Sequence, residues 1–136
     1  MNPITIFEEL NKLDFEIVHY KLKKAGYSPE MISRMQRECL RYLAVCAANT
    51  DPKRMHTPSP DVDEFWHNMI LSTKQYRTDV SRICGKYLDH LPNKSVEQKK
   101  FNDEFSFWNT IDDYEKFFGE PDMEIWGIKF KEGVNQ

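Results

Sequence analysis

Residues 59–92 read SPDVDEFWHNMILSTKQYRTDVSRICGKYLDHLP, and this stretch decides the fold because helix signals and candidate site residues concentrate in it. Ser59-Pro60 is typical of a helix start, since serine caps a free amide and proline suits the first helical position. Apolar residues then recur at three- and four-residue steps from Val62 to Met69, which predicts one buried helical face. Ser72 and Gln75 match a capping box, which predicts a second helix over residues 73–88.

The flanking sequence predicts further helices. Ser28-Pro29 opens a helix over residues 29–48, and residues 3–13 and 15–24 form either two helices or one continuous helix. Ser95 and Gln98 match another capping box, and the helix that follows is expected to bury Phe101, Phe105 and Trp108. Its apolar stripe then rotates by about a quarter of a turn. We attribute this rotation to a kink or a restart of the helix near residues 109–110, with Thr110 as a new cap.

These patterns predict an all-α fold: a single domain over residues 1–136, with about six or seven helices packed orthogonally around the helices of Trp66 and Tyr76. Residues 49–58 read as a mobile connector in which His56 is exposed. The aromatic tail, residues 122–136, is expected to pack against the domain, because it carries a large apolar area.

Composition excludes some classes of function. The net charge of −3 argues against nucleic acid binding, which needs a basic surface. No window of about 18 apolar residues is present, so we expect no membrane span and a soluble, cytoplasmic protein. Three cysteines form no closed disulfide framework. The sequence gives no oligomeric state.

Asp63, His67, Asp89 and His90 form a candidate metal site. Asp63 and His67 are four residues apart on one helix, so their side chains share a face. Asp89 and His90 end the next helix, which an antiparallel turn could bring back toward His67. Imidazole and carboxylate ligands suit a divalent transition metal such as zinc. The alternative is that His67 bonds Asp63 or a backbone carbonyl and stabilises the packing.

Two enzymatic hypotheses are weaker. Cys84 could act as a nucleophile with His67 or His90, but it lies on the predicted apolar stripe, where an inert core cysteine is expected. Two carboxylates from Asp112, Asp113, Glu115 or Glu120 could form an acid–base pair, but two acids at a predicted helix start are ordinary dipole partners.

The leading hypothesis is a non-enzymatic protein-binding or adaptor domain. The second half of the chain has more aromatic residues than one small core needs, and aromatic side chains anchor interfaces. A protein partner is therefore expected on a surface drawn from residues 101–130. The candidate contact residues are Trp108, Tyr114, Phe117, Phe118, Trp126 and Phe130.

The runs RYLAVCAAN, SPDVDEFWHNMILSTKQYRTDVSRICGKYLDHLP and YEKFFGEP resemble the glycine-rich domain-containing protein-like family over about residues 27–121. The resemblance implies the same helical fold and no settled activity. Three positions, Met69, Val80 and Asp89, depart from the family's His and Cys pattern, which implies a lost or remodelled metal site. The positions that match the pattern are Asp63, Trp66, His67, Tyr76, Asp79, Gly85, His90 and Pro92, among which Trp66, Tyr76, Gly85 and Pro92 are expected to be structural.

Overall fold

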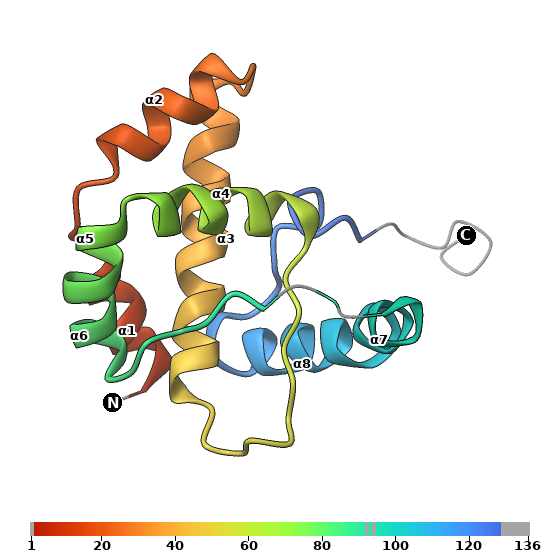
Figure 1. Cartoon of the computed structure of the whole chain (residues 1–136). Coiled ribbons are helices and arrows are strands. Elements are labelled where there is room, and N and C mark those ends of the chain that lie inside the picture. Colours follow the sequence, from red (N-terminus) through yellow and green to blue (C-terminus); the bar gives the residue numbers. More distant parts are fainter. Residues whose placement is uncertain (1, 92, 94, 129–136) are drawn as a thin grey trace.

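Six continuous helical segments occur in the part of the chain that the structure describes, and Figure 1 shows their arrangement. The computed structural model describes residues 2–91, 93 and 95–128, and no strand occurs among them. The first four segments are α1 (Pro3–Leu10), α2 (Glu16–Lys24), α3 (Pro29–Ala48) and α4 (Pro60–Leu71). The fifth joins α5 (Thr73–Gln75), η1 (Tyr76–Val80) and α6 (Ser81–Cys84), and the sixth joins α7 (Val96–Phe101), η2 (Asn102–Ser106) and α8 (Phe107–Phe118). The predicted all-α fold is confirmed.

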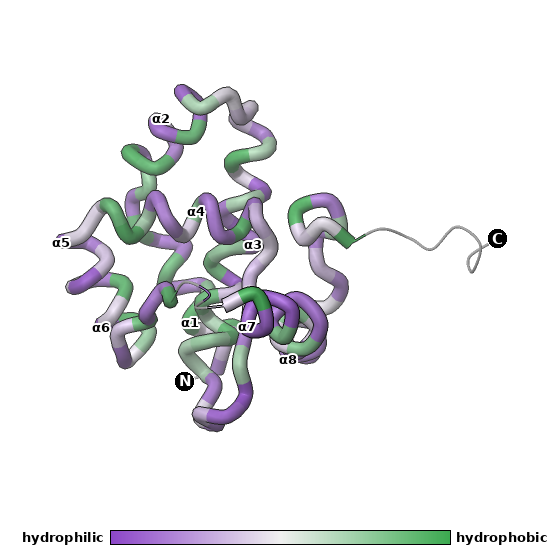
Figure 2. Tube along the Cα trace, turned by 45° about the vertical axis from the view of Figure 1, so that its right-hand side comes forward, coloured by the Kyte–Doolittle hydropathy of each residue, from purple (hydrophilic) through white to green (hydrophobic). Residues whose placement is uncertain are grey.

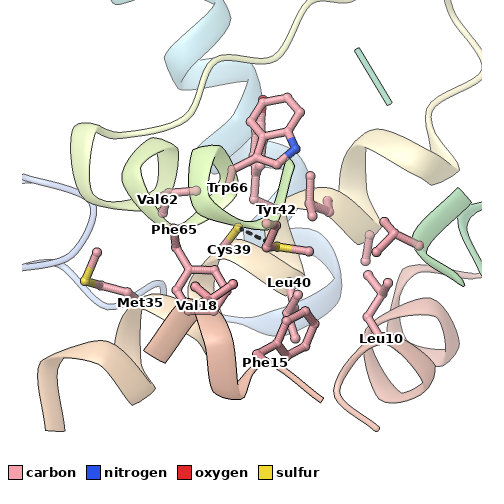
Figure 3. Close-up of a cluster of buried hydrophobic side chains, with 14 of the residues drawn as sticks. Leu10, Phe15, Val18, Met35, Cys39, Leu40, Tyr42, Val62, Phe65 and Trp66 are labelled. Atoms are coloured by element: carbon pink, nitrogen blue, oxygen red, sulfur yellow. Dashed lines mark hydrogen bonds between the residues drawn. The ribbon is translucent and has the colours of Figure 1, made fainter. Parts of the chain in front are cut away.

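Helix α3 is the centre of the domain and contacts α1, α2, α4, α6 and α8. Its residues Leu40, Leu43 and Ala44 are fully buried. Figure 3 shows how side chains from α1, α2 and α4 converge on α3, with Phe65 of α4 beside Val18 of α2. The described helices alternate hydrophobic and hydrophilic positions (Figure 2), and none of them is long and apolar enough to cross a membrane.

Serine caps begin three of the helices where the sequence predicts them. Ser28 Oγ accepts a hydrogen bond from the Met31 amide at 3.1 Å, and Ser95 Oγ accepts one from the Gln98 amide at 3.0 Å. Ser59 Oγ accepts from the Val62 amide at 3.2 Å and also donates to the Ile125 carbonyl at 2.8 Å. The cap of α4 therefore also holds the C-terminal segment.

The predicted Ser72–Gln75 capping box is wrong, because Ser72 makes no side-chain cap bond. The helical segment that follows contains a π-helical turn, η1, and ends at Cys84 rather than at residue 88. Gly85 ends it in the left-handed conformation, with φ of +77°. Residues 86–91 then run without helical structure toward α7.

The predicted kink near residues 109–110 is also wrong, since α7, η2 and α8 form one continuous helical segment over residues 96–118. The π-helical turn at 102–106 is what rotates the apolar stripe, because a π turn holds more residues than an α turn. Thr110 is no cap: its hydroxyl donates to the Ser106 carbonyl at 3.0 Å within the helix and accepts from the Thr57 amide at 2.9 Å.

Candidate functional site

Trp66 and Tyr76 form a buried hydrogen-bond chain that ties α4, η1 and the segment after α6 together. Trp66 Nε1 donates to Tyr76 Oη at 2.8 Å, and the Tyr76 hydroxyl donates to the Leu88 carbonyl at 2.5 Å. Both rings are buried. Burial raises the pKa of Tyr76, against a smaller opposite effect of the Trp66 hydrogen bond, so the phenol stays neutral and able to donate.

This chain places His90 against α4. The imidazole Nε2 of His90 is hydrogen-bonded to Asp63 Oδ1, and its ring centroid lies 4.6 Å from that of Trp66 at an interplanar angle of 58°. Both polar side chains remain partly exposed, 28% for His90 and 44% for Asp63. The polar niche beside Trp66 therefore consists of an acid–imidazole pair on an indole ring.

The four residues of the predicted metal site do not converge. Asp63 and His90 meet, but His67 and Asp89 are exposed. In the part of the chain that the structure describes, no three His, Cys, Asp or Glu side chains are arranged to hold a metal ion. The segment ending at His90 crosses α4 on the side of Asp63 and Trp66. His67 lies one helical turn after Asp63, but its side chain is exposed and it forms no ligand cluster with Asp63 and His90.

A second polar cluster contradicts the prediction of an exposed His56 in a mobile loop. His56 is 4% exposed at its side chain, and its Nε2 lies 2.6 Å from Asp113 Oδ2 on α8. Arg54 binds the same carboxylate through two hydrogen bonds, of 2.8 and 2.9 Å. Burial raises the pKa of Asp113, but the hydrogen bonds from Arg54 and His56 outweigh it, and the pKa lies below its ordinary value. The connector is thus held on α8.

The third cluster surrounds Glu38, whose side chain is fully buried in α3. Its Oε1 accepts hydrogen bonds from Tyr114 Oη at 2.7 Å, Trp126 Nε1 at 2.9 Å and the Asp122 amide at 3.0 Å. Its Oε2 accepts one from Arg37 Nε at 3.0 Å. A buried carboxylate needs such partners, because it has lost its hydration. Glu38 therefore fixes α8 and the C-terminal segment on α3.

Arginines on α3 strengthen the same attachment. Arg34 binds Asp122 through two hydrogen bonds, of 2.8 and 2.9 Å, and reaches Glu124 at 2.7 Å. The hydrogen bond from Arg34 lowers the pKa of Asp122. Arg41 donates to Tyr114 Oη at 2.9 Å, and its guanidinium carbon lies 5.2 Å from the ring centroid of Phe118. The C-terminal segment is thus bound by charge-assisted hydrogen bonds.

The predicted partner-binding residues separate into three groups. Tyr114 and Trp126 are buried, so their assignment to an exposed surface is wrong. Both side chains donate hydrogen bonds to the Glu38 carboxylate instead. Phe117 and Phe118 are half-buried, and Trp108 is 48% exposed. Phe130, like the predicted structural residue Pro92, lies outside the described residues.

The expected burial of the first aromatic stripe is wrong as well. Phe101 is 50% exposed and Phe105 is 55% exposed, and their ring centroids lie 5.1 Å apart. The neighbouring positions Asn102 and Ser106 face the protein: Ser106 is buried, and Asn102 donates to Asn93 Oδ1 at 2.6 Å. The polar side of the helix is turned inward at this end, and the aromatic side faces outward.

Sequence reasoning missed Glu38 and the cluster of Arg54, His56 and Asp113. One signal was available for Glu38, which lies three residues after Met35 and four before Tyr42, within the buried stripe of α3. A charged residue at such a position requires buried partners. No comparable local signal marks His56, because its partner is 57 residues away in the chain.

The thiols are poor nucleophiles. Burial raises the pKa of Cys84 to about 12, and burial also raises that of Cys46 to about 12. Cys39 is buried, with its sulfur 3.9 Å from the sulfur of Met69. A thiolate is the reactive form, so these sites do not favour thiol chemistry.

A surface hollow of about 860 Å³ lies where α2 meets the end of α4, and Ile17 and Leu71 line it.

Comparison with known proteins identifies the family. The UCP032817-like family model matches residues 9–111. The chain belongs to the UCP032817-like family. The resemblance to the glycine-rich domain-containing protein-like family is wrong, because the matching model describes a different and uncharacterised family. Searches of curated proteins and of solved structures found no significant match.

The family assignment changes the meaning of the three apparent departures. Met69, Val80 and Asp89 differ from the pattern of a family to which the chain does not belong, so they imply no lost ligands. Met69 and Val80 are core residues here. The match includes Phe101, Phe105 and Trp108 but ends before Tyr114 and Trp126, the aromatic partners of Glu38.

We expect Glu38→Ala to lower the free energy of unfolding by about 3–5 kcal/mol, because it leaves buried donors and arginines without their carboxylate. Urea denaturation at neutral pH measures this loss. Glu30→Ala on the same helix is the matched control. It removes only the exposed 3.9 Å pair with Arg34, and should cost about 0.5 kcal/mol. Equal effects of the two substitutions would contradict the role of Glu38.

The lowered pKa of Asp113 predicts a pH dependence. A carboxyl whose folded pKa is below its unfolded value stabilises the fold above the unfolded pKa, and this contribution is lost as the pH falls through the folded pKa. Asp113→Asn should therefore destabilise the protein at pH 7 more than at about pH 3. Urea denaturation at both pH values checks this, with the exposed neighbour variant Asp112→Asn as control. An unchanged difference from the wild type at the two pH values would refute the expectation.

Proposed function

We propose that the chain is a protein-binding domain whose contact surface is the aromatic face, defined as Phe101, Phe105 and Trp108. The observation that supports it is their exposure: each of the three rings is about half exposed, at 50%, 55% and 48% respectively. Aromatic rings are large apolar groups, and a contiguous exposed patch of them is a common mark of an interaction site.

Two of the three residues of the aromatic face, Phe101 and Phe105, lie on a projecting part of the helical segment, and Trp108 follows at the start of α8. Residues 96–106 form α7 and η2, and among the described elements η2 is the only one with which α7 shares an extensive contact. Helix α8, by contrast, packs on α1 and α3. In Figure 1, α7 lies at the end of this helical segment, away from α1 and α6. A partner could therefore reach the aromatic face without displacing the core.

The π-helical turn explains how one helical segment both packs into the core and exposes aromatic residues to solvent. Beyond it, Ile111 and Tyr114 point into the core. Before and within it, Phe101 and Phe105 point outward. Insertion of a π turn shifts the faces of the helix on its two sides. The part of the segment after the turn thus holds it on the core, and the part before the turn exposes aromatic side chains for a partner.

Affinity capture from an extract of the native cell tests this proposal. The tagged wild-type chain should retain a protein partner, and Phe105→Ser or Trp108→Ser should lose it, because each removes a large anchor from the contact surface. The control is Tyr20→Ser on α2, where the tyrosine is 65% exposed and distant in the chain. Retention that is equally strong in all four proteins would contradict the proposal.

A second candidate function, metal binding, is supported by the contact between Asp63 and His90. A carboxylate and an imidazole side by side suit zinc when water or a partner supplies further ligands. Titration with zinc, followed by elemental analysis after dialysis, tests it. Near-stoichiometric zinc in the wild type that is lost in His90→Ala supports this function, and its absence from the wild type contradicts it. His19→Ala is the control, since His19 lies on α2 and is hydrogen-bonded to Gln36.

A further inference from the structure

We infer that the aromatic face binds a second copy of this chain, by antiparallel pairing of residues 96–108 across a twofold axis. This inference rests on the proposed protein-binding function and specifies its partner. Two observations support it, the spacing of the rings and the distribution of charge beside them, and the area that the rings expose sets the expected strength.

The spacing is self-complementary. The rings of Phe101 and Phe105 lie side by side, with centroids 5.1 Å apart, and Trp108 follows three residues after Phe105 at the start of α8. In an isologous contact, residue i meets residue j and j meets i. An antiparallel pair centred between the two phenylalanines places Phe101 of each copy opposite Phe105 of the other. The phenylalanine rings of the two copies then pack against each other, and Trp108 of each copy packs at the end of the contact.

The charges favour the same arrangement. Lys100 and Glu104 are exposed and four residues apart, so they lie on one flank of the aromatic face. The other flank holds Asn102 and Ser106, which are uncharged and turned toward the body of the domain. When two identical helices pair in antiparallel fashion, like flanks meet. Lys100 of one copy then lies beside Glu104 of the other, twice in each dimer.

A parallel pair lacks this complementarity, because it brings unlike flanks together. Lys100 and Glu104 would face the uncharged side of the other helix, where Asn102 already bonds Asn93 and Ser106 is buried. The neighbouring pair of Lys99 Nζ and Asp103 is satisfied within its own helix at 2.7 Å. The flank of Lys100 and Glu104 therefore distinguishes the two orientations.

The exposed area sets the expected strength. Three half-exposed aromatic rings leave roughly 300 Å² of apolar surface per copy. A standard interface buries about 800 Å² per partner, of which about 60% is apolar. The pair is thus smaller than a standard interface, and we expect a reversible dimer with a dissociation constant on the order of 10–100 µM.

Sedimentation equilibrium of the full chain between about 5 and 500 µM tests the inference. The wild type should pass from monomer to dimer in this range. Lys100→Glu and Glu104→Lys should each weaken dimerisation by roughly tenfold, because each creates two like-charge contacts. Phe105→Ser should remain monomeric, and far-UV circular dichroism of every variant checks that the fold is kept.

The decisive measurement mixes the two charge variants. An equimolar mixture of Lys100→Glu and Glu104→Lys should dimerise as strongly as the wild type, because opposite charges meet again at both contacts. The double variant should also recover, with the signs exchanged. Failure of both to recover, or a wild type that is monomeric at 500 µM, would overturn the inference.

These outcomes are separable from those of the proposed function. A monomeric wild type that still captures a different protein through Phe105 would overturn self-pairing and leave the protein-binding function intact. A monomeric wild type that captures nothing would overturn both. A dimer that is unaffected by Phe105→Ser would show that another surface pairs, and would contradict the inference.

Discussion

The buried carboxylate of Glu38 is the constraint on which the arrangement of the second half of the chain depends. Such a group is stable away from water only when donors surround it, and three of its donors come from residues 114–126. Meeting this requirement brings the end of α8 and the segment after it onto α3. The rings of Tyr114 and Trp126 are consequently committed to the core and are not available to a partner.

The beginning of the same helical segment, α7, shares no extensive contact with α3 among the described residues. The π-helical turn at 102–106 lies between the two halves and changes which side of the helix faces the body. Asn102 and Ser106 face the protein, whereas Phe101 and Phe105 face outward. The anchored end and the exposed aromatic residues thus lie on opposite sides of the π-helical turn.

The sequence predicts features that depend on neighbouring residues. The caps at Ser28, Ser59 and Ser95 each involve an amide three residues away, so their helix starts are visible in the sequence. It does not predict which aromatic rings are buried, because that depends on the register of α8 on α3. The pairing of His56 with Asp113 and that of Asp63 with His90 likewise follow from segments that meet only in the folded chain.

The three tryptophans test most directly which aromatic rings are buried and which are exposed. Trp66 and Trp126 are 5% and 1% exposed, whereas Trp108 is 48% exposed. The chain can be labelled with 5-fluorotryptophan and studied by fluorine NMR at low micromolar concentration with a soluble paramagnetic agent, each resonance being assigned from a Trp→Phe variant. One resonance, that of Trp108, should broaden strongly while the other two stay sharp. A strongly broadened Trp126 resonance, or a protected Trp108, would contradict the account.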